Sequence, residues 1–201
     1  MKIPSKYIEN AVDQISSLPG IGKRTALRLV LQLMSRSKEE IEDFSNAFIL
    51  MKEHVKKCST CGNVSDIEVC IICSNIARDN TLICVVEDVR DVLAIEATES
   101  YNGVYHVLGG IISPMDGIGP NDLNIPSLID RAQQGSVKEI IFALSATMEG
   151  DTTNFFLYRK LRAFEISIST LSRGVSVGAE LQYADEITLS RSLINRQPFE
   201  V

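Results

Sequence analysis

Residues 58–73 read Cys58-Ser-Thr-Cys61-Gly-Asn-Val-Ser-Asp-Ile-Glu-Val-Cys70-Ile-Ile-Cys73, and this stretch separates two parts of the chain with different patterns. Within each cysteine pair the residues are two positions apart, so one tight turn can bring both thiols to the same side of the backbone. Gly62 suits the first turn. The spacing predicts one structural Zn²⁺ held by four thiolates, with no position open for a substrate. Two disulfides are the weaker alternative, because thiols stay reduced inside a cell.

The chain before the cysteines has helical periodicity. Apolar residues recur every three or four positions on both sides of Leu18-Pro19-Gly20-Ile21-Gly22, which predicts two short amphipathic helices joined by a tight turn. A third helix is predicted after Ser37, because the Ser-x-x-Glu spacing of residues 37–40 is that of a capping box. Its apolar face continues to Val55.

The turn between the first two helices predicts an anion site. Gly20 and Gly22 let the backbone turn so tightly that its N–H groups, with the start of the next helix, can face a phosphate oxygen. Lys23, Arg24 and Arg28 add positive charge beside it. The pattern is that of a helix-hairpin-helix, which predicts DNA binding that is independent of base sequence. A plain pair of helices with solvated basic residues is the alternative.

After the cysteines, short apolar runs alternate with helical patterns. Strands are predicted at 82–86, 105–108, 139–144 and 166–171, and helices at 89–97, 127–134, 153–163 and 186–195. This alternation predicts an α/β domain with a mainly parallel sheet. The Gly- and Pro-rich segment 109–124 is predicted to be an exposed loop, and its Gly-Ile-Gly-Pro lacks the flanking helices of a second hairpin.

The ends of two predicted strands resemble the Toprim domain of topoisomerases, primases and related nucleases. Glu87 follows the first strand, where ligands of parallel sheets gather, and Glu149-Gly150 matches the Toprim Glu-Gly. Ser145 and Thr147, however, occupy the positions of the Asp-x-Asp pair that holds Mg²⁺ in those enzymes. Hydroxyls are poor substitutes for carboxylates around a hard cation, so the catalytic site is predicted to be dismantled. A Mg²⁺-dependent Toprim nuclease or strand-transfer enzyme is the alternative.

Other residues of types that can catalyse reactions or bind ligands are predicted to have structural roles or no clear site. His106 and Cys84 fall in predicted apolar strands and are predicted to be packed there. His54 lies near the cysteines, but four thiolates already complete the metal site. The segment 175–181 could approach a ligand through its glycine, yet it lacks the pattern of a phosphate loop.

Composition and charge limit the remaining classes. The 201 residues are 45% hydrophobic and 23% charged, as in an ordinary globular protein. No apolar run approaches the roughly 18 residues of a membrane span, and residues 1–7 do not form a secretory signal, which predicts a soluble cytoplasmic protein. The net charge of −6 divides into +3 up to residue 57 and −9 beyond it. The basic part suits phosphate, whereas the acidic part suits a metal, a basic protein surface or solubility alone.

The order of these modules resembles the RecR family of bacterial recombination mediators over essentially the whole chain. The resemblance depends on five stretches taken together: Leu18–Gly22, the four cysteines, Ile83–Glu87, Tyr105–Gly110 with Ser113–Pro120, and Gly174–Gly178. Two small departures are Lys23, where many relatives have proline, and Ser145-Ala146 in place of a Thr-Asn type of stretch. The implied domains are a helix-hairpin-helix region (1–55), a zinc finger (56–79), a Toprim-like domain (80–175) and a C-terminal segment (176–201).

The resemblance implies a non-enzymatic DNA repair protein. Members of the family form a ring-like homotetramer that can encircle single- or double-stranded DNA and work with RecO and RecF to load RecA at single-stranded gaps. Candidates for receiving a basic partner such as RecO are the acidic residues Glu87, Asp91, Glu149 and Asp151. A zinc-stabilised interaction protein without DNA contact is a third possible class.

Overall fold

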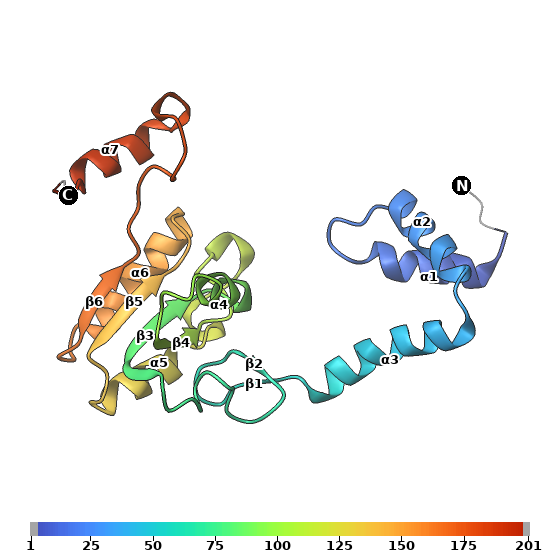
Figure 1. The fold of residues 1–201 in the computed structure, drawn as a ribbon, viewed down its shortest axis with the longest axis horizontal. Coiled ribbons are helices and arrows are strands. Elements are labelled where there is room, and N and C mark those ends of the chain that lie inside the picture. The colour runs from blue at the N-terminus through green and yellow to red at the C-terminus, as the bar shows by residue number, and fades with distance from the viewer. Residues whose placement is uncertain (1–3, 199–201) are drawn as a thin grey trace. The chain divides into compact units, whose positions relative to one another are not determined.

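The computed structural model describes residues 4–198 and divides the chain into two compact units, with the boundary between Val55 and Lys56 (Figure 1). The predicted features at residues 1–3 and 199–201 lie outside the described residues. In the part of the chain that the structure describes, no helix is both long and apolar enough to cross a membrane.

The first unit contains the three predicted helices, α1 (Lys6–Ser16), α2 (Lys23–Met34) and α3 (Lys38–His54). α1 and α2 pack against each other through a small core of Val12, Ala26 and Val30. α3 begins with the predicted capping box, in which the N–H of Ser37 donates to Glu40 Oε2 at 2.8 Å and the N–H of Glu40 donates to Ser37 Oγ at 3.2 Å. No residue of α3 is buried, so the apolar face predicted for this helix is left uncovered.

The second unit contains the predicted parallel sheet. Its four strands are β3 (Asp79–Val86), β4 (Gly103–Val107), β5 (Glu139–Ala143) and β6 (Ser167–Thr170), in the order β4-β3-β5-β6. The helices are α4 (Val89–Glu96), α5 (Ile125–Gln133), α6 (Met148–Leu161) and α7 (Glu186–Ile194), with short 3-10 turns at Pro114–Asp116, Pro120–Asp122 and Leu181–Tyr183. A two-stranded antiparallel ribbon, β1 (Lys56–Lys57) with β2 (Val64–Ser65), precedes the sheet.

Helices cover both faces of the sheet (Figure 1). Alternate residues of β3 point to opposite faces, so Ile83 and Val85 pack with α5 and α6, whereas Cys84 and Val86 pack with α4. Both faces are therefore apolar, as buried parallel strands require. His106 of β4 is fully buried, and the predictions that it and Cys84 are packed strand residues are confirmed.

Two sequence-based expectations need correction. Helix α6 begins at Met148 rather than at residue 153, because Thr147 caps it and its polar first turn hides the apolar period. The segment 109–124 is not exposed throughout, since Ile112 and Leu123 enter the main core. The N–H of Ile112 also donates to Thr153 Oγ1 at 2.9 Å, which fixes this segment to α6.

Candidate functional site

The four predicted metal ligands come together at the start of the second unit. The Sγ atoms of Cys58, Cys61, Cys70 and Cys73 all lie within 4.8 Å of one another; three of these residues are buried and Cys73 is half-buried. The Sγ atoms of Cys61 and Cys70 are 3.6 Å apart. A tetrahedral Zn²⁺ site with Zn–S bonds of about 2.3 Å has sulfur atoms roughly 3.8 Å apart, so the cluster has the dimensions of a metal site.

Backbone geometry holds the first cysteine pair in place. Gly62 adopts a φ of +77°, a conformation that side chains other than glycine rarely adopt. This turn lets the N–H of Gly62 donate to the carbonyl of Cys58 at 2.9 Å, while the N–H of Cys58 donates to the carbonyl of Asn63 at 2.7 Å. The N–H of Cys70 donates to Cys58 Sγ at 3.2 Å, which ties the second pair to the first.

The pKa values of these thiols differ, and the differences favour a bound cation. Burial acts to raise the pKa of Cys58, but the backbone N–H groups of Cys70, Cys61 and Thr60 lower it to about 6. The neighbouring thiol of Cys73 and burial raise the pKa of Cys61, and burial raises that of Cys70. Without a metal, therefore, one thiol ionises readily and opposes ionisation of its neighbours. A bound divalent cation removes that conflict, because metal ligands bind as thiolates.

The predicted DNA-binding residues lie at the turn between α1 and α2. Gly20 has a φ of +79°, and Gly22 is the N-cap of α2 without a side-chain cap. Both glycines are exposed, and no atom lies within 4 Å of the position that a Cβ would take at either of them. Arg24 and Arg28 are exposed and pair with no carboxylate within residues 4–198. Lys23 Nζ lies 3.3 Å from Asp13 Oδ1, so its charge is partly balanced within the unit.

The predicted Toprim residues meet at the carboxyl ends of neighbouring strands. Glu87 follows β3 directly, and Ser145 follows the adjacent β5. Ser145 Oγ donates to Glu87 Oε2 at 3.2 Å. Thr147 Oγ1 accepts from the N–H of Gly150 at 3.1 Å and so caps α6. Each hydroxyl at an Asp-x-Asp position therefore has a structural partner.

The four acidic residues predicted to receive a partner have different surroundings. Asp91 Oδ2 accepts from the N–H groups of Glu87 (3.2 Å) and Asp88 (3.1 Å) at the start of α4. Asp151 pairs with Arg173, whose hydrogen bond lowers the pKa of Asp151, and its other oxygen lies 3.7 Å from Arg191. Glu149 is exposed, and Glu87 is half-exposed.

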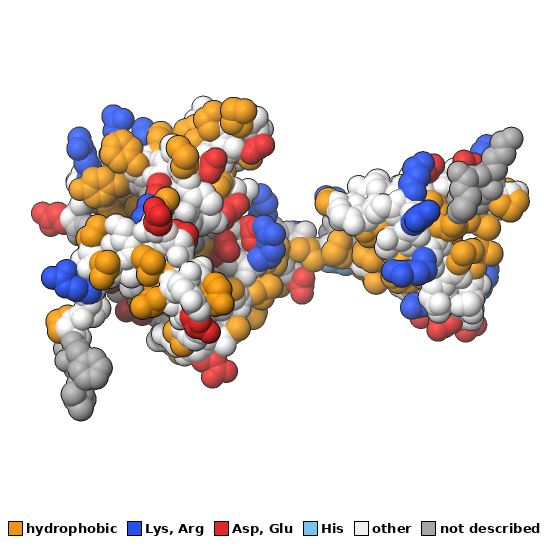
Figure 2. Space-filling view, turned by 90° about the horizontal axis from the view of Figure 1, so that it is seen from above, with side chains coloured by type: hydrophobic (Ala, Val, Ile, Leu, Met, Phe, Trp, Pro, Cys, Tyr) orange, Lys and Arg blue, Asp and Glu red, His pale blue; other side chains and the backbone are white. Residues whose placement is uncertain are grey.

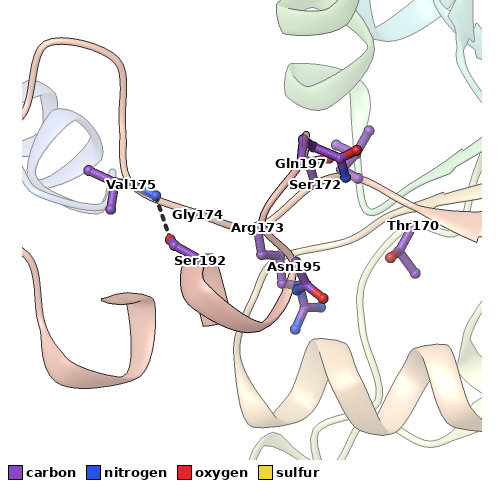
Figure 3. A pocket seen from close by; sticks show the side chains of 9 residues that line it. Thr170, Ser172, Arg173, Gly174, Val175, Ser192, Asn195 and Gln197 are labelled. Carbon is purple, nitrogen blue, oxygen red and sulfur yellow. Dashed lines mark hydrogen bonds between the residues drawn. The ribbon is translucent and has the colours of Figure 1, made fainter. Parts of the chain in front are cut away.

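The arginine partners of Asp151 carry no sequence signal, because they lie 22 and 40 positions away. They connect α6 to the C-terminal segment. That segment is also held by Ser192 Oγ, which accepts from the N–H of Val175 at 3.1 Å and donates to the carbonyl of Thr188 (Figure 3). A cavity of about 520 Å³ lies beside this contact, between the segment following β6 and the end of α7.

The fold and these sites define a Toprim protein that carries a helix-hairpin-helix module and a four-cysteine metal site. Comparison with family models matches a Toprim domain to residues 81–172, a RecR helix-hairpin-helix to residues 8–50 and a RecR C-terminal region to residues 174–197. The matches thus cover both units.

Full-length relatives agree with this match. The chain is 58% identical to the recombination protein RecR of Flavobacterium johnsoniae over 200 residues, covering 100% of this chain and 97% of the relative. It is 56% identical to RecR of Parabacteroides distasonis over 200 residues, covering 100% and 96%. It is 57% identical to RecR of Phocaeicola vulgatus over 196 residues, covering 98% and 96%. The chain belongs to the RecR family of recombination proteins, which act in DNA repair.

Proposed function

We propose that this protein is a non-enzymatic mediator that clamps single- or double-stranded DNA independently of sequence. In the cytoplasm it acts with RecO and RecF to load RecA at single-stranded gaps. The four regions 1–55, 56–79, 80–175 and 176–201 belong to the same proposal. The main support for it is that Ser145 and Thr147 occupy positions where a Toprim enzyme needs carboxylates, and that both hydroxyls are hydrogen-bonded within the chain.

The chemistry of these positions favours a scaffold over a nuclease. Mg²⁺ is bound by carboxylate oxygens, which also neutralise its charge. At the carboxyl ends of these strands Glu87 supplies one carboxylate, but Ser145 donates a hydrogen bond to it and Thr147 caps helix α6. A Toprim nuclease or strand-transfer enzyme would therefore lack two of its metal-binding acids.

The helix-hairpin-helix supports DNA contact. Arg24 and Arg28 are exposed cations beside the uncapped start of α2, and the helix dipole there favours a phosphate. Phosphate contacts position a protein on DNA but carry no base information. Figure 2 shows Lys and Arg side chains exposed on the N-terminal unit. These features support binding that depends on charge and salt rather than on sequence.

Self-association, proposed as a homotetrameric ring, is supported by α3. Its large apolar side chains are each 42–54% exposed: Phe44, Phe48, Ile49, Leu50 and Met51. Most of the stability of a protein helix comes from packing of an apolar face, and α3 buries none. A second copy of the chain would supply the missing contact.

The metal is proposed to be one structural Zn²⁺ held by Cys58, Cys61, Cys70 and Cys73. Four thiolates suit this ion, and a closed set of four leaves it a folding role. When bound, the ion cross-links the two cysteine pairs.

The acidic surface is proposed to receive RecO. Glu87 and Glu149 are the better candidates, because Asp151 is already paired with arginines and Asp91 accepts two backbone hydrogen bonds. Glu87 accepts one hydrogen bond, from the neutral hydroxyl of Ser145, and Glu149 is exposed. The variant E87K/E149K is expected to lose RecO capture while keeping DNA affinity. E165K, which reverses another exposed carboxylate, is the matched control. Full retention of RecO capture by E87K/E149K would refute this assignment.

The central experiment combines native mass with an activity assay. We expect an oligomer that contains one zinc per chain, binds gapped duplex DNA and gives no cleaved or relaxed products with Mg²⁺ or Mn²⁺. Metal-dependent products would refute the mediator proposal and favour a Toprim enzyme. Failure to bind DNA at low salt would leave a zinc-stabilised interaction protein.

A further inference from the structure

Arg131 of α5 is a largely buried cation without a carboxylate partner in residues 4–198. Its Nη1 donates to the carbonyl of Tyr105 at 2.8 Å and lies 3.4 Å from His106 Nδ1. Neither group carries a negative charge. Burial lowers the pKa of His106 to about 4, so this ring is neutral at pH 7. A guanidinium in such surroundings needs an anion nearby, because an uncompensated buried charge is strongly unfavourable.

Arg131 lies near the turn between the first two cysteines. Ser59 and Thr60, which lie between the first two cysteines, line a cavity of about 410 Å³ together with Arg131 and Asp130. Burial lowers the pKa of Arg131, whereas the charges of the nearby Cys73, Cys61 and Cys58 act in the opposite direction. The cysteine cluster is thus a source of negative charge near the guanidinium, whereas Asp130, which lines the same cavity, forms no ion pair with Arg131 among the described residues.

The same part of the sheet holds the cysteine pair rigidly. The N–H of Val107 in β4 donates to the carbonyl of Cys61 at 2.7 Å. A Cβ on Gly62 would lie 2.9 Å from the carbonyl oxygen of Val107 and 2.8 Å from Asn124 Nδ2, which shows how closely the turn is seated. The backbone carbonyl of Asn124 in turn accepts a 2.7 Å hydrogen bond from His106 Nε2.

The second cysteine pair is also anchored. Ile72, between Cys70 and Cys73, packs against both the cysteine cluster and the apolar cluster beneath α4. The cysteine cluster and the Toprim core therefore share side chains and backbone hydrogen bonds.

The charge of a zinc-loaded cluster would compensate that of Arg131. Four thiolates outnumber the two positive charges of Zn²⁺, so a loaded cluster stays negative. We propose that Arg131 is a positioning residue of the metal centre, whose guanidinium balances the loaded thiolate cluster and couples metal binding to the stability of the Toprim domain. This inference rests on the proposed zinc.

The test compares R131M, R131K and R78M in the full-length protein. Arg78 is the matched control, because it is also a poorly exposed arginine of the second unit but pairs with Glu96. Zn²⁺ affinity is measured by competition with a chromophoric chelator, and thermal unfolding is measured with and without Zn²⁺. We expect R131M to bind Zn²⁺ about 10- to 100-fold more weakly, as other outer-shell substitutions do. R131K should recover part of this loss, and R78M should bind Zn²⁺ like the wild type.

The stability measurements separate this role from plain packing. R131M should lower the melting temperature of the zinc-loaded protein more than that of the metal-free protein, because loss of the hydrogen bond to the Tyr105 carbonyl affects both forms. Equal Zn²⁺ affinity of R131M and wild type, or an equal loss of melting temperature with and without metal, would overturn the inference. If R131M does not fold, R131Q gives the same comparison because it also removes the charge, and wild-type Zn²⁺ affinity in R131Q would count against a charge role. Absence of zinc from the wild type would instead refute the proposed metal.

Discussion

Ser145 Oγ donates a hydrogen bond to Glu87 Oε2 across 58 positions of sequence. The contact exists because β3 and β5 are neighbours in a parallel sheet, so their carboxyl ends meet at one edge. In a Toprim enzyme this edge would place two acids beside a hard cation. Here the second group is a proton donor, which satisfies Glu87 without any metal.

Restoring the carboxylates should restore cation binding. The variant S145D/T147D is expected to gain measurable Mg²⁺ affinity, because three carboxylates would then converge at this edge. Helix α6 should survive, since aspartate is as good an N-cap as threonine. Isothermal titration with Mg²⁺ checks the gain, and S145N/T147N is the uncharged control. Equal Mg²⁺ binding by the wild type would show that the hydroxyls do not dismantle the site.

The metal ligands and most of the fold of the second unit could be predicted from local sequence. The metal ligands follow from the spacing of the Cys58 and Cys70 pairs, and the parallel sheet follows from alternating apolar runs. Those signals are local, because each depends on a turn or on a strand period. The predicted start of α6 is wrong, since its first turn is polar and only the cap at Thr147 marks it.

The contacts that connect distant segments could not be predicted. Arg131 meets Tyr105, and Arg173 meets Asp151, only after the strands have paired. The burial of Ile112 within a Gly- and Pro-rich loop depends in the same way on where α6 lies. Tertiary packing decides such contacts, and a single sequence records no pattern for them.

The hairpin arginines should determine DNA affinity. R24E/R28E is expected to weaken binding to any DNA sequence and to reduce the slope of log K against log salt by about 2, one for each lost phosphate contact. K23E should have a smaller effect, because Lys23 is already paired with Asp13. Fluorescence anisotropy at several salt concentrations measures both quantities, with K52E on α3 as the control. An unchanged affinity and slope in R24E/R28E would exclude the hairpin as the contact.

Gly150 should not tolerate a side chain. A Cβ there would lie 1.9 Å from the carbonyl oxygen of Ser145, so α6 or the loop before it must shift. We expect G150A to lower the free energy of unfolding by about 1–3 kcal/mol, the usual cost of overpacking. G119A is the control, because its Cβ would meet only Asp122 at an ordinary 3.5 Å. Urea denaturation gives the comparison, and equal stability of both variants would contradict the close approach of Gly150 to the Ser145 carbonyl.

The Arg78–Glu96 ion pair should make stability depend on acid pH. The hydrogen bond from Arg78 lowers the pKa of Glu96, and Tyr105 Oη donates to the same carboxylate at 2.7 Å. A lowered pKa in the folded state adds stability that is complete above the unfolded value of about 4.3 and is lost as the pH falls through the folded value.

The variant E96Q should therefore be less stable than the wild type by about 1.5–3 kcal/mol at neutral pH, the range for hydrogen bonds to charged groups. Below pH of about 4 the difference should shrink as Glu96 of the wild type becomes protonated. Urea denaturation across this range measures it, and E99Q, which removes an exposed carboxylate after α4, is the control. A difference that stays constant with pH would mean that the pair does not contribute through its charge.

The hydrogen bond from the N–H of Val107 to the carbonyl of Cys61 also protects an edge strand of the sheet. β4 is an edge strand, and its last N–H is occupied by the cysteine turn instead of being open to another chain. The opposite edge, β6, is only four residues long and is rich in hydroxyl side chains. Open edges recruit foreign strands and promote aggregation. Stripping the metal would loosen the turn that blocks β4, so the apo protein should be prone to intermolecular strand addition and precipitation.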